Sequence, residues 1–81
     1  MSLIISNMNT FKKALGLTIS SIRHNENMSQ EALAEISGLH RTYISEVELG
    51  KRNISIINLK KISNALNVPL YKIIKEAEQN D

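Results

Sequence analysis

Residues 29–50 contain the feature that most limits how this chain can fold, a pair of short helices joined by a tight turn. Ser29 can cap the first helix, because its hydroxyl can accept a hydrogen bond from an N–H group of the first turn. Gly38 can take the left-handed conformation that ends a helix and turns the chain. Ile44 and Val47, three residues apart, place one side of a second helix against a core. We expect the first helix to bury Leu33, Ala34 and Ile36.

The outward side of the second helix is compact and polar. Thr42, Ser45 and Glu46 lie opposite the two apolar anchors, and Arg41 lies at the edge, at the N-terminal end. Helices that read DNA enter the major groove with their N-terminal residues against base edges. Arginine can bond to guanine, threonine can pack on the thymine methyl group, serine can bond to several bases and glutamate can accept from cytosine. We predict that Arg41, Thr42, Ser45 and Glu46 read bases. For any one of these residues alone, a solvated polar surface is the better interpretation; for the whole set behind the paired helices, it is not.

Three further segments have the apolar pattern of helices, so we predict an all-α chain of five helices without strands. Apolar residues recur at helical spacing in each. The expected stripes are Phe11, Leu15, Thr18, Ile19 and Ile22 in a helix over 10–25, then Leu59, Ile62 and Leu66, then Leu70, Ile73, Ile74 and Ala77. Asn27 can adopt a left-handed turn after the first helix, and Ser55 can cap the fourth. We expect a flexible tail over 1–9, one domain over 10–78 and a frayed end over 79–81.

Composition and charge limit the classes of function that we expect for this chain. A chain of 81 residues allows one domain with a modest core. It has no cysteine, no apolar run of membrane-spanning length and no basic region before Met8, which favours a cytoplasmic protein without a membrane partner. Residues 10–61 hold eight Lys and Arg against five Glu, so the positive part of the chain contains the paired helices, as phosphate binding requires.

Nothing in the chain predicts catalysis. His24 and His40 are sixteen residues apart without a clustered acidic partner, so we expect no metal site. The sequence also lacks a nucleophile–base arrangement and a phosphate-binding glycine loop. We therefore expect a protein that is not an enzyme and needs no cofactor.

Several residues beside the polar helix are candidates for contacts with the DNA backbone. Gln30 lies at a helix N-terminus, where free N–H groups and the helix dipole favour an anion. The loop residues Lys51, Arg52 and Asn53 can reach a flanking strand, with a solvated turn as the alternative. His40 can contact a phosphate or face water. Tyr43 lies between the apolar and polar sides and can pack on the fold, contact DNA through its hydroxyl, or both.

The stretch over residues 15–55 resembles the lambda-repressor-like, Xre-type helix-turn-helix family. Within that family, R-T-Y-I-S at 41–45 followed by E-x-G-K-R-N-x-S at 48–55 resembles the controller proteins of restriction–modification systems. The resemblance covers about residues 10–75. It implies a compact five-helix DNA-binding domain that regulates transcription. It also implies a phosphate contact by Gln30 and a semi-buried ion pair between Arg23 and Glu48.

The resemblance also implies partners. Controller proteins act on their own operon, and a module of this size reads a pseudo-palindromic operator as a homodimer. The candidate dimer interface comprises Ile57, Leu70, Tyr71 and Ile74. Glu31 and Glu35 match acidic positions through which lambda-type activators contact the sigma subunit of RNA polymerase, with an ordinary solvated acidic surface as the alternative. An Xre-type antitoxin, which binds a partner toxin and represses its operon, is the alternative function.

Overall fold

Five helices make up most of the part of the chain that the structure describes. The computed structural model describes residues 8–81. Its helices are α1 (Met8–Asn25), α2 (Gln30–Ser37), α3 (Arg41–Glu48), α4 (Ile56–Leu66) and α5 (Leu70–Asn80), and these residues contain no strand. The predicted all-α fold of five helices is confirmed.

The helix ends form where the local sequence predicts them. The Ser29 hydroxyl accepts a hydrogen bond of 3.0 Å from the N–H of Ala32, and Ser55 caps α4 in the same way. Asn27 and Gly38 have positive φ angles of 54° and 76°. The left-handed conformation at Gly38 ends α2 and directs its N–H to the carbonyl of Ala34.

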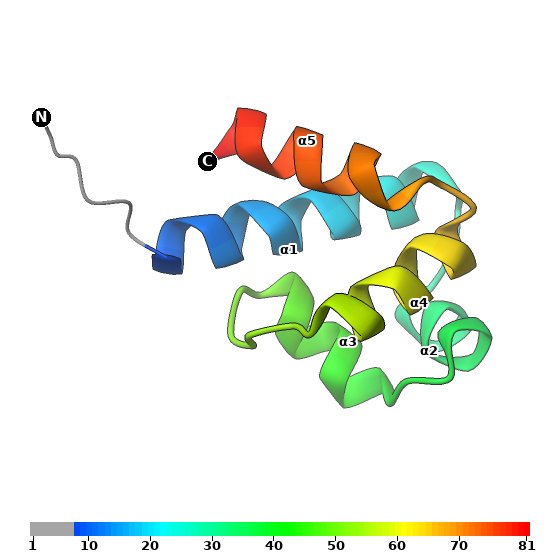
Figure 1. Cartoon of the computed structure of the whole chain (residues 1–81). Helices are drawn as coiled ribbons and strands as arrows, with labels where there is room; N and C mark the ends of the chain where they lie inside the picture. The colour runs from blue at the N-terminus through cyan, green and yellow to red at the C-terminus, as the bar shows by residue number, and fades with distance from the viewer. Residues whose placement is uncertain (1–7) are drawn as a thin grey trace, which may run out of the picture.

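The helices enclose one core, with α2 and α3 at one end (Figure 1). The long helix α1 lies beside α5 and also packs against α3, while α2 packs against α3 and α4. Each helix contributes side chains to the core; the largest fully buried apolar ones are Ile19, Leu33, Ile44, Ile62, Leu66 and Ile73. This packing holds the outward side of α3 at the surface.

The prediction that α2 buries Ile36 is wrong. Ile36 is 61% exposed, and Ser37 is buried beside Leu33 and Ala34 instead. At about 100° per residue, Ile36 lies roughly 100° away from the centre of the side formed by the other three. Position on the helix therefore outweighs side-chain polarity. The Ser37 hydroxyl meets its hydrogen-bonding requirement by donating to the Ala34 carbonyl at 3.2 Å.

Both ends of the helical region extend beyond the expected limits. Residues 1–7 of the expected tail lie outside the described residues, and α1 begins at Met8. The last helix continues to Asn80, within the segment that we expected to be frayed. The Thr10 hydroxyl donates a hydrogen bond of 2.8 Å to the carboxylate of Asp81, which joins the end of α5 to the start of α1.

One close approach between helices sets the position of α3. A Cβ atom added at Gly16 of α1 would lie 2.5 Å from the carbonyl oxygen of Glu48 and closer still to that of Val47. Only glycine lets the two backbones meet at this distance.

Candidate nucleic-acid interface

The structure places the four predicted base readers together on the outward side of α3. Ile44 and Val47 are buried beneath them, as expected from their spacing. Arg41 and Thr42 are exposed at the start of the helix, and Ser45 and Glu46 are partly exposed one turn later. A helix presenting its first turns in this way has the geometry for reading the major groove.

Arg41 forms an ion pair with Glu31 of α2 in the free protein. The Arg41 Nε atom lies 3.5 Å from Glu31 Oε2, and the two side chains are 60% and 67% exposed. An exposed pair contributes only about 0–1 kcal/mol to stability, whereas a bidentate arginine–guanine contact is worth about 1–3 kcal/mol. Arg41 can therefore exchange this carboxylate for a base.

A buried network lies behind α3. Glu48 accepts hydrogen bonds from Arg23 Nε at 2.6 Å and from Nη2 at 2.9 Å, and the two side chains are 6% and 8% exposed. Arg23 Nη1 also donates to the carbonyl of Met28 at 2.8 Å. The hydrogen bonds that Arg23 donates to Glu48 raise the pKa of Arg23 above its ordinary value despite burial. Arg23 thus stays charged, and the network connects α1 with α3 and with the start of the α2 region.

Gln30 extends this network to the N-terminus of α2. Its Nε2 atom donates to Glu48 Oε1 at 2.9 Å. An amide nitrogen carries two hydrogens, so one bond to Glu48 leaves a second N–H to donate. The carboxylate therefore fixes the Gln30 amide beside the free N–H groups of the helix start, where an anion is favoured.

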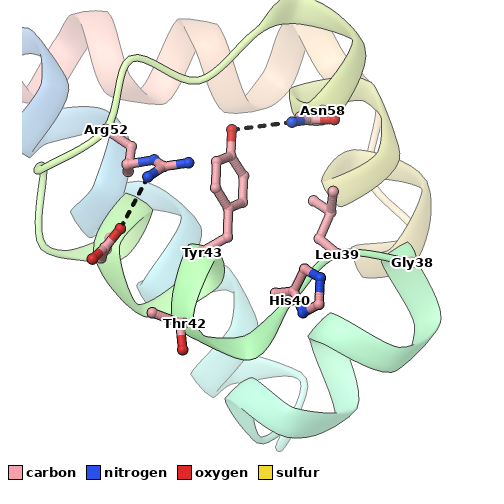
Figure 2. Close-up of a pocket in the computed structure, with 8 residues that line it drawn as sticks. Gly38, Leu39, His40, Thr42, Tyr43, Arg52 and Asn58 are labelled. Atoms are coloured by element: carbon pink, nitrogen blue, oxygen red, sulfur yellow. Dashed lines mark hydrogen bonds and ion pairs between the residues drawn. The ribbon is translucent and has the colours of Figure 1, made fainter.

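A surface groove of about 420 Å³ lies between α3, the loop after it and the start of α4 (Figure 2). Tyr43 points across it from α3, and its hydroxyl accepts a hydrogen bond of 3.2 Å from Asn58 Nδ2. The guanidinium carbon of Arg52 lies 4.7 Å from the centre of the Tyr43 ring. Arg52 Nη1 also donates to Glu46 Oε1 at 3.3 Å. Tyr43 thus packs on the fold while its hydroxyl lies in the groove.

The other predicted backbone-contact residues lie at the N-cap position of α3 and in the loop that follows it. Lys51, Arg52 and Asn53 are exposed in the loop between α3 and α4. His40 lines the groove at the N-cap position of α3 without capping the helix through its side chain. The groove and loop thus continue the polar side of α3 towards α4.

Asn58 is a residue of this surface that the sequence analysis did not identify. It lies in the first turn of α4, three residues after the Ser55 cap. In the sequence, the only sign of its role is that Asn58 is polar and lies near a predicted helix start. Its contact with Tyr43, fifteen residues away, depends on how α4 packs.

The remaining candidates lie on other surfaces. Ile57 and Tyr71 are exposed on α4 and α5, whereas Leu70 and Ile74 are partly buried against the core. Glu35 is exposed on α2. Within residues 8–81, no group of three or more His, Cys, Asp or Glu side chains is placed to hold a metal ion. The described helices include none that is long and apolar enough to cross a membrane.

Comparison with known proteins agrees with this geometry. The sequence profile of a helix-turn-helix family, HTH_3, matches residues 19–73. Control protein C.SmaI from Serratia marcescens is 46% identical over 63 residues, which cover 78% of this chain and 75% of that protein. The chain belongs to the helix-turn-helix family of controller proteins.

Solved structures of controller proteins have the same fold. The restriction–modification controller protein C.AhdI from Aeromonas hydrophila superposes with a TM-score of 0.76 at 35% identity, over 76% of this chain and 94% of that chain. C.Esp1396I bound to a 19-base-pair DNA duplex gives a TM-score of 0.79 at 33% identity, over 86% of this chain and 93% of that chain. Both matches thus cover most of this chain and nearly all of the controller protein.

Proposed function

We propose that this controller protein is a sequence-specific transcription regulator that binds an operator of its own restriction–modification operon. The exposed polar side of α3, positioned by the buried Arg23–Glu48 pair, is the observation that carries the proposal. The DNA-bound relative C.Esp1396I supports it. The function includes no catalytic step, and its place is the cytoplasm of a prokaryotic cell, where the operator lies.

We propose that the active species is a homodimer. One protomer presents a single α3, which reads one half-site, and dimers read two half-sites separated by roughly one helical turn, about 34 Å. The exposed Ile57 and Tyr71, with the partly exposed Leu70 and Ile74 of α5, are the proposed interface on α4 and α5. Apolar side chains of this size lose unfavourable contact with water when a second copy covers them.

Fluorescence anisotropy tests the function directly. The duplex upstream of the start codon and a scrambled duplex of equal length are titrated at several salt concentrations. We expect tight binding of two protomers to the upstream duplex, and weak binding to the scramble that falls steeply with salt. Equal weak binding to both would contradict the proposal and would favour the antitoxin function, which co-purification with a second small protein would identify.

Replacing Arg41 with alanine should weaken binding to the operator by about 1–3 kcal/mol. The loss should be confined to operators that keep the base pair read by Arg41, because the bidentate contact is specific to guanine. Affinities for a set of operators with single base-pair changes measure this. A uniform loss across all duplexes, scramble included, would make Arg41 a phosphate contact instead.

We propose that the acidic residues of α2 contact the sigma subunit when the protein activates transcription. Glu31 also pairs with Arg41, so its replacement would disturb DNA binding, whereas Glu35 does not take part in that pair. Glu35→Lys should therefore keep operator affinity within about twofold, as expected for a surface change, and abolish activation in an in vitro transcription assay. If Glu35→Lys retains activation, the proposal is contradicted and the acidic residues of α2 form an ordinary solvated surface.

A further inference from the structure

Four side chains on the DNA-facing surface form one continuous chain of contacts (Figure 2). Glu46 accepts a hydrogen bond from Arg52, Arg52 lies over the ring of Tyr43, and the Tyr43 hydroxyl accepts from Asn58. The chain begins in α3, passes through the loop and ends in α4. It therefore joins the outward side of α3 to the following loop and to the start of α4.

Glu46 is the acidic member of this chain of contacts, and a carboxylate on a surface proposed to face DNA needs an explanation. DNA presents phosphates on both sides of the groove, and like charges repel. The Glu46 oxygen is directed at Arg52, 3.3 Å away, rather than left unpaired towards the solvent. A carboxylate held by an arginine has less of its acceptor capacity left for a cytosine amino group.

Arg52 is held from two directions. The Tyr43 ring lies beneath the guanidinium at 4.7 Å, and Glu46 bonds to one end of it. Each contact alone is weak, because the Arg52 and Glu46 side chains are 50% and 39% exposed. Together they limit the rotamers of a long, flexible side chain in a loop, which lowers the entropy lost when Arg52 docks in this orientation.

We propose that Glu46 is a positioning residue that determines specificity through Arg52, and that it does not read a base. This inference rests on the proposed DNA-binding function. Glu46 holds Arg52 on Tyr43, in the orientation that docking of α3 at the operator uses. On other duplexes, a phosphate must compete with Glu46 for Arg52, and the carboxylate repels the backbone. Glu46 therefore lowers affinity for unrelated DNA more than for the operator.

The test compares Glu46→Gln with the wild type on the upstream duplex and on the scramble, at several salt concentrations. We expect binding of the variant to the scramble to tighten by about two- to fivefold, the equivalent of one exposed ion pair. The salt dependence of binding to the scramble should steepen by about one counterion in the variant, because Arg52 becomes free to contact a phosphate. The matched control is Glu78→Gln, which removes an exposed carboxylate from α5. It should leave the ratio of the affinities for the upstream duplex and the scramble unchanged.

The double variant with Arg52→Ala separates the two possible roles of Glu46. If Glu46 acts through Arg52, the effect of Glu46→Gln on the affinity ratio should largely disappear once Arg52 is absent. If Glu46 reads cytosine, the substitution should alter preference at one base pair, and that change should persist without Arg52. The second result would overturn the proposal.

NMR of the free protein tests the geometry independently of DNA. The ring current of Tyr43 should shift the side-chain protons of Arg52 upfield, and Glu46→Ala should move them towards the values seen in Tyr43→Leu. Arg52 shifts that are equal in the wild type and in Tyr43→Leu would overturn the positioning role. If the shifts behave as expected but the wild type does not distinguish the upstream duplex from the scramble, the proposed operator function fails and the positioning of Arg52 stands.

Discussion

Replacing Glu48 with alanine should lower the free energy of unfolding by about 3–5 kcal/mol. The substitution leaves the Arg23 guanidinium buried, with its side chain 8% exposed and only the Met28 carbonyl as a hydrogen-bond partner. It also removes the acceptor that holds the Gln30 amide. A domain of this size has a total stability of about 5–15 kcal/mol, so the loss would unfold a substantial part of the population. Urea denaturation measures it.

Two further variants define the cause of that loss. Glu31→Ala removes a carboxylate from the exposed pair with Arg41 and should change stability by less than about 0.5 kcal/mol. Arg23→Met combined with Glu48→Leu replaces the whole pair with apolar groups, and it should recover much of the loss because no charge remains buried. A cost below about 1 kcal/mol for Glu48→Ala would place the pair in the same class as a surface ion pair.

Gly16→Ala should also destabilise the protein, by about 1–3 kcal/mol. In an open helix the same change would stabilise by about 0.5–1 kcal/mol, because alanine is the better helix former. At Gly16 the added Cβ would overlap the carbonyl oxygens at the end of α3, and these are backbone atoms that cannot rotate away. The two helices must therefore separate, which also displaces the side of α3 proposed to face DNA.

Thermal unfolding and operator affinity together check this prediction. Ser21→Ala, an exposed position in the same helix, is the control and should leave both quantities almost unchanged. A more stable Gly16→Ala variant with unchanged affinity would show that α1 and α3 can separate without cost.

The short-range features of the fold were predictable because they depend on spacing along one helix or on one turn. Ser29 and Ser55 cap helices through N–H groups three residues away, and Gly38 and Asn27 accept positive φ angles. The apolar stripes of α1 and α4 follow from the helical repeat. Ile36 is the exception, because it lies roughly 100° around the helix from the side formed by Leu33, Ala34 and Ser37, which packs on the core.

The candidate site also combines features that were predictable from one helix with contacts that were not. The outward side of α3 follows from one helix, so the sequence identified Arg41, Thr42, Ser45 and Glu46 as neighbours. The contacts between that side of α3 and other helices could not be predicted from the spacing of residues along the chain. Arg41 meets Glu31 of α2, and Tyr43 meets Asn58 of α4, only because the core fixes the angles between these helices. For Glu46, tertiary packing replaces the expected cytosine contact with an arginine as the proposed partner.

The sequence by itself therefore determined the helices, their caps, the turn between α2 and α3, and which residues share the polar side of α3. Each of these depends on interactions within a few residues of the backbone. The tertiary structure alone decided the close approach at Gly16, the exposure of Ile36, and the contact chain from Glu46 to Asn58. Those features depend on distances between helices, which the packing of the whole core sets.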